Sequence, residues 1–287
     1  MARDPLHRLR QIRHVALDRD GTLYKGDTLF PCTLPFLAEL DQLGMGYTFL
    51  TNNPSKSAGD HVAYLQSLGL PARREQLYTS ADATIDHLRT TQPEVRRLFL
   101  LGTPSMIAQF TEAGFVSTTD SASDEPDAVV VGFDLTLTYA RLCRAAWWIQ
   151  RGKYFVATNP DWVCPTDQPT VLVDCGAICA ALEKATGRMP DITLGKPDPM
   201  MLRGILDRHG LQAHQVAMEG DRIYTDMLMA HRAHALGVLV LTGEASAADA
   251  AAAQPPLDLV MPSLAEFGGL LRSANPPVGN APGARLK

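Results

Sequence analysis

The feature that most constrains the fold is an alternation of short apolar runs with amphipathic segments along almost the whole chain. The apolar runs are typical of buried strands, and the segments between them have helical periodicity. Strands that are apolar on both faces and are separated by helices indicate parallel sheets covered on both sides, and so an α/β fold. The predicted strands are residues 14–18, 47–51, 97–102, 128–133, 153–158, 215–219, 236–242 and 257–261. The predicted helices include residues 57–68, 104–113, 138–151, 174–186, 199–209 and 222–234.

Composition excludes several classes of protein. The chain has 287 residues, of which 46% are hydrophobic and 20% are charged, and this is an ordinary globular composition. Its net charge of −5 gives no general attraction to nucleic acid or to an anionic membrane. No apolar run approaches the roughly 20 residues of a membrane helix. The basic N-terminus lacks the apolar core of a signal peptide, so we expect an exposed arm there.

The five cysteines carry no sign of a disulfide framework or a zinc ribbon, because their number is odd and no CxxC occurs. Cys175 and Cys179 lie four residues apart on a predicted helix. We expect them to be small buried residues rather than a redox pair. This usage fits a reducing cytoplasm, where we expect the protein to be found.

Acidic residues gather where two of the predicted strands end. The stretch LDRDGTLY, residues 17–24, places Asp18 and Asp20 after the first strand, and Asp221 and Asp226 follow the strand at 215–219. In open parallel sheets, functional groups collect at the carboxyl ends of strands. The other polar residues expected near this edge are Thr22, Thr51, Asn52, Asn53 and Lys196.

This set of side chains suits metal-assisted phosphoryl transfer. Clustered carboxylates repel one another unless a cation lies among them, and Mg²⁺ takes one or two carboxylates while leaving room for a phosphate oxygen. A lysine, a hydroxyl group and backbone N–H groups at helix starts suit a phosphate dianion. One aspartate can attack phosphorus, and a second can protonate the leaving oxygen and then activate water.

Four motifs, DRDGT, TNN, GKPDP and GDRIYTD, occur in the order found in phosphatases of the haloacid dehalogenase superfamily. The chain resembles this superfamily over residues 12–272. The long insert between the second and third motifs resembles the α/β cap of the nitrophenylphosphatase-like subgroup, subclass IIA. The resemblance implies a Rossmann-like doubly wound parallel sheet core with an inserted α/β cap domain. The expected parts are core residues 1–80, cap residues 81–190, core residues 191–272, and a disordered Pro- and Gly-rich tail at 273–287.

The same resemblance implies a role for each motif residue. Asp18 would be the nucleophile and Asp20 the general acid and base. Mg²⁺ would be held by Asp18, the backbone carbonyl of Asp20, and Asp221. Asp226 would orient the motif lysine or the metal-bound waters. The residues that would hold the phosphate are Thr51, Asn52, through its amide, and Lys196.

A local repeat raises the question of which Thr-Asn turn faces the ligand. GYTFLTNNP at 46–54 is similar to GKYFVATNP at 152–160. The resemblance assigns the first turn to the phosphate site. It assigns Thr158 and Asn159 to the cap, where they would serve its structure or its contact with the core.

Two positions depart from the usual pattern of the subgroup, because Arg19 and Glu219 stand where apolar residues are common. The strands that carry them are expected to be neighbours. We therefore predict a partly buried ion pair between Arg19 and Glu219 beneath the metal site, whose loss would cost about 3–5 kcal/mol. The rival hypothesis is that Arg19 reaches toward the substrate or the cap.

The resemblance implies a Mg²⁺-dependent phosphatase of a small phosphomonoester metabolite, such as a sugar phosphate or a nucleoside monophosphate, acting through an aspartyl phosphate. A cap that closes over the site makes proteins and nucleic acids poor substrates. Two alternatives stay open: a phosphotransferase or mutase using the same aspartyl phosphate, and a non-catalytic metabolite-binding protein of this fold. The resemblance also suggests a homodimer through the cap.

Overall fold

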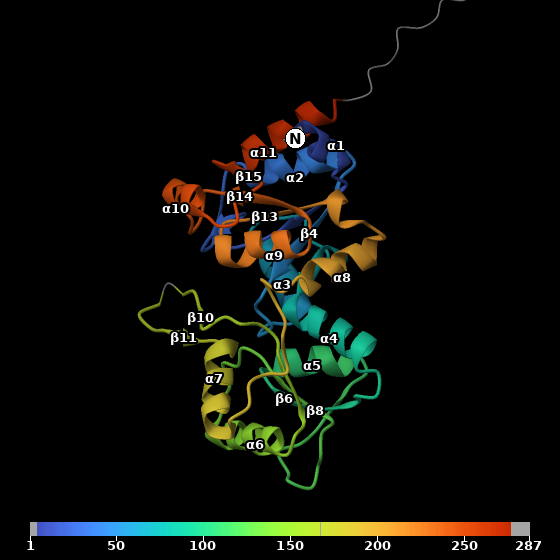
Figure 1. Cartoon of the computed structure of the whole chain (residues 1–287), viewed down its shortest axis with the longest axis vertical. Coiled ribbons are helices and arrows are strands. Elements are labelled where there is room, and N and C mark those ends of the chain that lie inside the picture. Colours follow the sequence, from blue (N-terminus) through green and yellow to red (C-terminus); the bar gives the residue numbers. More distant parts are fainter. Residues whose placement is uncertain (1–4, 167, 277–287) are drawn as a thin grey trace, which may run out of the picture.

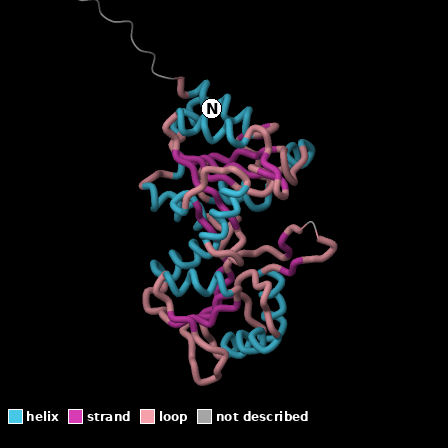
Figure 2. Tube along the Cα trace, turned by 180° about the vertical axis from the view of Figure 1, so that it is seen from behind, coloured by secondary structure: helices cyan, strands magenta, loops and turns pink. Residues whose placement is uncertain are grey.

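The strands assemble into two separate parallel sheets, each covered by helices, in a computed structural model that describes residues 5–166 and 168–276. Figures 1 and 2 show the two units as lobes stacked along the long axis of the molecule. Every pairing between neighbouring strands of the two large sheets is parallel. The predicted α/β fold with covered parallel sheets is therefore confirmed.

The first lobe is built on a sheet with the strand order β15-β14-β13-β1-β4-β5. From β1 the sheet continues through β4 on one side and through β13 on the other. In open parallel sheets, ligands bind at the carboxyl ends of the strands where the strand order reverses in this way. Its strands are β1 (His14–Leu17), β4 (Gly46–Thr51), β5 (Leu77–Thr79), β13 (Val216–Gly220), β14 (Leu236–Val240) and β15 (Leu259–Met261). One face is covered by α1 (Pro5–Gln11), α2 (Thr33–Gln42), α3 (Ala58–Ser67) and α11 (Leu264–Ala274), and the other by α8 (Met200–His209) and α9 (Leu228–Arg232).

The second lobe is inserted into the first and has the strand order β12-β9-β8-β6-β7. Its strands are β6 (Arg97–Leu101), β7 (Val116–Ser117), β8 (Ala128–Val131), β9 (Tyr154–Ala157) and β12 (Ile192–Thr193). One face packs on α4 (Ser80–Thr91) and α5 (Pro104–Glu112), and the other on α6 (Tyr139–Gln150) and α7 (Cys175–Thr186). Cys175 and Cys179 are buried on α7, as predicted.

Shorter elements complete the two lobes. They are the hairpins β2 (Tyr24–Lys25) with β3 (Thr28–Leu29) and β10 (Val163–Cys164) with β11 (Leu172–Val173), the π-helical turn η3 (Ile223–Met227), the 3₁₀ turns η1 (Arg74–Gln76) and η2 (Ala213–Gln215), and α10 (Ala247–Ala252). In the part of the chain that the structure describes, no helix combines the length and the hydropathy that a membrane span needs.

Several helices begin at capping residues directly after a strand or a short loop. Ser57 caps α3 by accepting from Asp60 N, and the Asp60 carboxylate accepts from Ser57 N in return. Thr79 and Asp82 form the same box at the start of α4. These caps satisfy N–H groups that a helix leaves free at its start. Thr79 is also the last residue of β5, so α4 begins directly at the carboxyl end of that strand.

Three boundaries differ from those expected. Ile192–Thr193 pairs with β9 and so lies in the sheet of the insert, beyond the expected boundary at residue 190. Ser273 and Ala274 belong to α11 rather than to a tail; residues 277–287 of that predicted tail lie outside the described residues. The expected N-terminal arm contains α1, followed by Ile12. Leu9 of α1 and Ile12 are both buried in the core of the first lobe.

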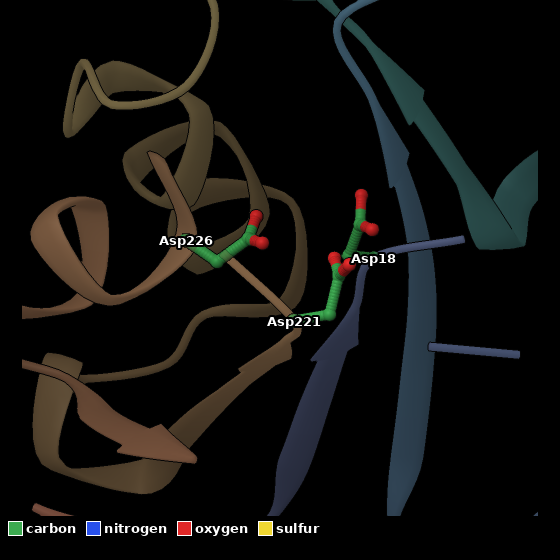
Figure 3. Close-up of side chains that lie close together, drawn as sticks. All are labelled: Asp18, Asp221 and Asp226. Carbon is green, nitrogen blue, oxygen red and sulfur yellow. The ribbon is translucent and has the colours of Figure 1, made fainter. Parts of the chain in front are cut away.

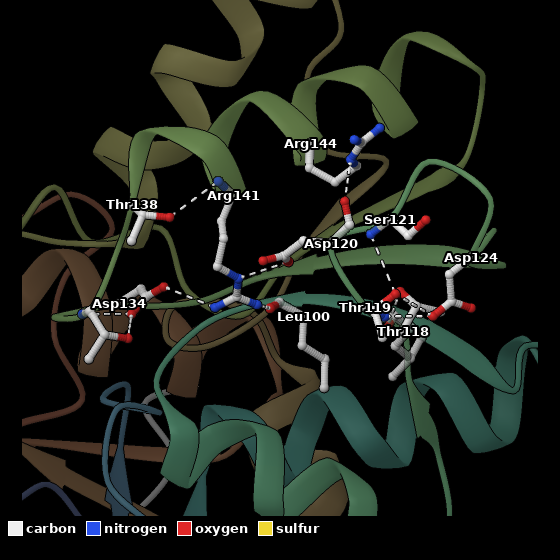
Figure 4. Close-up of polar contacts among 12 residues, drawn as sticks. Leu100, Thr118, Thr119, Asp120, Ser121, Asp124, Asp134, Thr138, Arg141 and Arg144 are labelled. Atoms are coloured by element: carbon white, nitrogen blue, oxygen red, sulfur yellow. Dashed lines mark hydrogen bonds and ion pairs between the residues drawn. The ribbon is translucent and has the colours of Figure 1, made fainter.

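The polar segment 117–127 is tied to the rest of the insert by Arg141 of α6 (Figure 4). The Arg141 guanidinium lies 3.3 Å from Asp120 Oδ1 and 4.0 Å from Asp134 Oδ2, and it donates to the Leu100 carbonyl oxygen. Arg144 Nε donates to the Asp120 carbonyl oxygen at 2.8 Å. Arg141 therefore ties the loops around Asp120 and Asp134 to strand β6 of the insert.

Candidate active site

The two aspartates of the DRDGT motif follow β1 directly but lie in different environments. Asp18 N donates to the Glu219 carbonyl oxygen at 2.9 Å, which continues the β1–β13 ladder and leaves Asp18 buried at the sheet edge. Asp20 is exposed at the rim. Partial burial, with a smaller contribution from the negative charge of Asp18, raises the pKa of Asp20 despite the nearby Arg19. A raised pKa increases the fraction of Asp20 that is protonated at a given pH.

Lys196 joins Asp18 to Asp226. Its buried Nζ contacts Asp18 Oδ1 and lies 2.8 Å from Asp226 Oδ1. Burial alone would lower the pKa of Lys196, but the two carboxylates outweigh it and raise the pKa above the usual range. The ammonium group is therefore charged and offsets part of the negative charge of the aspartates.

Asp18, Asp221 and Asp226 form a buried carboxylate cluster, with one oxygen from each lying within 4.8 Å of the others (Figure 3). Burial, with the negative charge of Asp18, raises the pKa of Asp221 to about 6, and burial raises that of Asp226 to about 7. Among the described residues, Asp221 Oδ1 has no hydrogen-bond partner. A buried carboxylate oxygen without a donor, beside two further carboxylates, fits a hard divalent cation.

Two glycines, Gly21 and Gly243, leave the space that the Asp221 carboxylate occupies. Gly21 has a φ of +79°, and a Cβ there would lie 2.2 Å from Asp221 Oδ2. A Cβ on Gly243 would lie 1.9 Å from the same oxygen. Glu244 N donates to Asp221 Oδ2 at 2.7 Å. The loop after β14 thus holds Asp221 by close backbone approach, a role that sequence reasoning missed because nothing marks Gly243 apart from its place after a strand.

The turn after β4 faces the same edge. Thr51 ends the strand, and its Oγ1 accepts from Asn53 N at 3.1 Å. The Asn52 side chain accepts from Lys196 N at 2.6 Å and donates to the Lys196 carbonyl oxygen at 3.0 Å. It therefore holds the lysine loop, and only the backbone amide of Asn52 is left to serve a phosphate as predicted.

The insert closes the site from the opposite side. Asp161, which sequence reasoning missed although it follows the ATNP segment, accepts from Asn52 Nδ2 at 3.0 Å. Asn159 Nδ2 donates to the Asn52 carbonyl oxygen at 2.7 Å, which is the contact between cap and core expected for the second Thr-Asn turn. Together the lobes enclose a pocket of about 90 Å³ over Asp18 and Lys196, lined from the insert by Asp161, Val163, Cys164, Pro165 and Asp174.

The predicted ion pair between Arg19 and Glu219 is wrong. Arg19 Nη1 lies 2.9 Å from His61 Nδ1 on α3, and the described residues provide no partner for either carboxyl oxygen of Glu219. Glu219 stands in the sheet between Leu17 and Val238, where burial raises its pKa well above the usual range. Arg19 lies beyond the end of β1, and its guanidinium extends to α3 instead of back along the sheet.

The fold and this site define a haloacid dehalogenase-type hydrolase. The sequence matches a family model described as haloacid dehalogenase-like hydrolase over residues 15–116, and a HAD-hydrolase-like model over residues 193–267. The chain is 31% identical over 256 residues to the ribonucleotide monophosphatase NagD of Escherichia coli, covering 89% of this chain and 98% of that one. The chain belongs to this family.

Solved structures agree with this assignment. A 4-nitrophenylphosphatase from Thermotoga maritima is 38% identical, with a TM-score of 0.85 over 92% of this chain and 98% of that one. A glycerol phosphate phosphatase from Mycobacterium tuberculosis, in complex with magnesium, is 32% identical, with a TM-score of 0.81 over 89% of this chain and 77% of that one. The chain is thus a phosphoric monoester hydrolase of subclass IIA, the nitrophenylphosphatase-like group.

Proposed function

We propose that the protein is a Mg²⁺-dependent phosphatase that hydrolyses a small phosphomonoester through an aspartyl phosphate on Asp18. The observation that carries this proposal is the contact of Lys196 Nζ with both Asp18 and Asp226, beside the unpartnered oxygen of Asp221. A buried lysine and a carboxylate cluster that fits a divalent cation, both beside Asp18, suit a dianionic phosphate, whose charge both can neutralise.

In the first step, a carboxylate oxygen of Asp18 forms a bond to phosphorus while the bond from phosphorus to the ester oxygen breaks. Lys196 stabilises the charge on the phosphoryl oxygens. Protonated Asp20, whose pKa is raised, gives its proton to the leaving oxygen, so the alcohol departs neutral. Asp20 suits this role because it is exposed and lines the same pocket as Asp18 and Lys196.

In the second step, the Asp20 carboxylate takes a proton from a water molecule, whose oxygen forms a bond to phosphorus. The bond from phosphorus to the Asp18 oxygen breaks, which releases inorganic phosphate and restores both aspartates. The insert shields the reacting centre, because Asp161 and both residues of β10 line the pocket that contains Asp18.

The residues present fit a divalent cation. Asp18 and Asp221 would hold it, with the backbone carbonyl of Asp20, while Asp226 fixes Lys196. When bound, the cation supplies charge neutralisation that lets the carboxylate approach the phosphate dianion. Because Asp226 is paired with Lys196, we assign it an orienting role rather than direct coordination.

The test is a phosphate-release screen over nucleoside monophosphates, glycerol phosphate, sugar phosphates and p-nitrophenyl phosphate, with Mg²⁺ and with EDTA. The screen includes these classes because the named relatives act on ribonucleotides, glycerol phosphate and nitrophenyl phosphate. Asp18→Asn is the blank. Release that needs Mg²⁺ and is lost in Asp18→Asn supports the proposal. Transfer to a sugar acceptor with little release would instead favour a phosphotransferase.

A further inference from the structure

Arg222 follows Asp221 directly in the chain, but its guanidinium pairs with a different acid. Arg222 Nε lies 3.0 Å from Glu244 Oε2, in the loop after β14. Among the described residues, Asp221 Oδ1 has no hydrogen-bond partner, whereas Asp221 Oδ2 accepts from Glu244 N at 2.7 Å. A buried carboxylate oxygen is therefore left without a donor beside an arginine that is held elsewhere.

Arg222 is anchored close to the carboxylate cluster. Its backbone N donates to Asp226 Oδ2 at 3.1 Å, and its side chain lines the phosphate pocket together with Asp18. Burial is the main reason that the pKa of Asp221 is raised, and the charge of Arg222 counters part of that rise. The positive charge of this arginine therefore acts on the same carboxylates that would bind the metal ion.

The Glu244 carboxylate is itself held by a second donor. Tyr224 Oη donates to Glu244 Oε2 at 3.1 Å, and this is the same oxygen that faces Arg222 Nε. The Glu244 side chain is 48% exposed, so water weakens the ion pair, and its strength is that of a surface pair with one added hydrogen bond. Glu244 thus contacts Asp221 through its backbone and Arg222 through its side chain.

An arginine that was free beside this cluster would compete with a metal ion. A guanidinium group is always charged, and it can bond to both oxygens of a carboxylate at once. Mg²⁺ needs carboxylate oxygens that are ionised and open to it. A pair between Arg222 and Asp221 would occupy such oxygens and would place a positive charge where the ion binds. The acid that holds Arg222 away therefore favours metal binding.

We propose that Glu244 is a positioning residue that holds the Arg222 guanidinium away from Asp221 and so keeps an oxygen of Asp221 open for Mg²⁺. The inference rests on the proposed function, in which Asp221 is a ligand of the metal ion. The role of the Glu244 side chain is separate from that of its backbone N–H, which holds the other oxygen of Asp221 and is kept in any substitution except proline.

The test is a double-mutant cycle that measures the Kd for Mg²⁺ by calorimetry on the whole chain. Glu244→Gln removes the charge but keeps an oxygen that can accept from Tyr224, and Arg222→Met removes the guanidinium but keeps an unbranched side chain. Glu244→Gln alone should raise the Kd by roughly three- to fivefold, the upper range for a half-exposed ion pair. In the Arg222→Met background the same substitution should change the Kd by less than about 1.5-fold, because no guanidinium is left to restrain.

The cycle separates this role from simple attraction between Glu244 and the metal ion, because loss of a distant negative charge would raise the Kd by the same factor in both backgrounds. The matched control is Glu266→Gln on α11, an exposed glutamate whose Oε2 accepts from Ser263 Oγ at 2.7 Å, and it should leave the Kd unchanged. Turnover of p-nitrophenyl phosphate by Glu244→Gln should fall at limiting Mg²⁺ and return to the wild-type rate at saturating Mg²⁺.

Three results would overturn the inference: a Kd that Glu244→Gln leaves unchanged, a Kd that it raises equally in both backgrounds, or a loss of turnover that saturating Mg²⁺ does not restore. Wild-type protein that binds Mg²⁺ and releases phosphate while giving any of these results overturns the role of Glu244 alone. Wild-type protein that neither binds Mg²⁺ nor releases phosphate from any substrate of the screen refutes the proposed function and the role of Glu244 with it.

Discussion

Nη1 of Arg19 lies 2.9 Å from Nδ1 of His61, and Nε2 of the same imidazole lies 3.0 Å from the Asn53 carbonyl oxygen. Because a guanidinium group can only donate, Nδ1 must accept, and the proton of the neutral ring must lie on Nε2. Burial, helped by the charge of Arg19, lowers the pKa of His61 to about 3, which agrees with a neutral ring. His61 thus connects the loop that carries Asp18 to the turn after β4.

We expect His61→Leu to lower the free energy of unfolding by about 1.5–3 kcal/mol, because it leaves a buried charged donor without its acceptor. It should also lower kcat/KM, since Arg19 and Asn53 both lie in loops that line the phosphate pocket. His61→Gln keeps an acceptor and a donor on one side chain and should recover part of both losses. Denaturant unfolding and steady-state kinetics measure these effects; equal behaviour of the two variants would show that His61 acts only by filling space.

A substitution at Glu219 tests directly whether this residue forms an ion pair with Arg19. Its carboxyl group is buried, and the described residues provide it with no partner. We expect Glu219→Leu to raise the free energy of unfolding by about 1–3 kcal/mol, because it removes an unsatisfied polar group from an apolar part of the sheet. An ion pair with Arg19 would give the opposite sign. A loss of about 3 kcal/mol or more in urea unfolding would restore the ion-pair hypothesis.

Gly243 should control the affinity for Mg²⁺. A methyl group there would overlap Asp221 Oδ2, so Gly243→Ala must displace this carboxylate or the loop. We expect the Kd for Mg²⁺, measured by calorimetry, to rise about tenfold or more, by analogy with the effect of disturbing groups that orient metal ligands. The matched control is Gly269→Ala on α11, where no atom lies within 4 Å of the new methyl group. Equal Kd values for the two variants would contradict the role of Gly243.

Stability should fall in mild acid, in part because of His14. Burial, with a smaller contribution from His209, lowers the pKa of His14 to about 3, against about 6.5 in an unfolded chain. Below about pH 6.5 the unfolded chain binds a proton that the folded protein does not, so the free energy of unfolding falls by about 1.4 kcal/mol per pH unit, down to about pH 3.

His14→Gln removes this titration and should give a shallower decrease between about pH 6.5 and pH 5. Its amide can still bond to Thr48, whose Oγ1 lies 2.8 Å from His14 Nε2. The control is His214→Gln, because His214 is exposed and lies near the same edge of the core. Slopes that agree among the wild type and both variants would assign the acid sensitivity to other groups.

Most of the regular fold could be predicted from local sequence patterns, and the exceptions are two very short strands and one helix held by tertiary packing. The predicted strand at 128–133 and helix at 104–113 correspond to β8 and α5 because continuous apolar runs and helical periodicity persist over several residues. β12 and β7 have two residues each, too few for any period to show. The unexpected helix α1 depends on tertiary packing of Leu9, which a short basic segment does not reveal.

Part of the candidate site could likewise be predicted from the sequence, and part of it could not. That Asp18, Lys196 and Asp221 lie at one edge of the sheet could be predicted from the sequence, because each of them follows a predicted strand or precedes a predicted helix. The partner of Arg19 could not be predicted, since His61 lies 42 residues away and side-chain direction decides the contact. The insert's part in the pocket depends on how the two lobes meet, and no local pattern carries that information.

The central claim is that phosphate passes through Asp18, and the most direct measurement is mass spectrometry of acid-quenched protein during turnover of p-nitrophenyl phosphate with Mg²⁺. Asp20→Asn is the variant to use, because nitrophenolate leaves without an acid while activation of water is slowed. The account predicts a phosphoryl group on the peptide that contains Asp18, and none in Asp18→Asn. Phosphate release by Asp18→Asn at the wild-type rate, or turnover with no labelled peptide in Asp20→Asn, would contradict it.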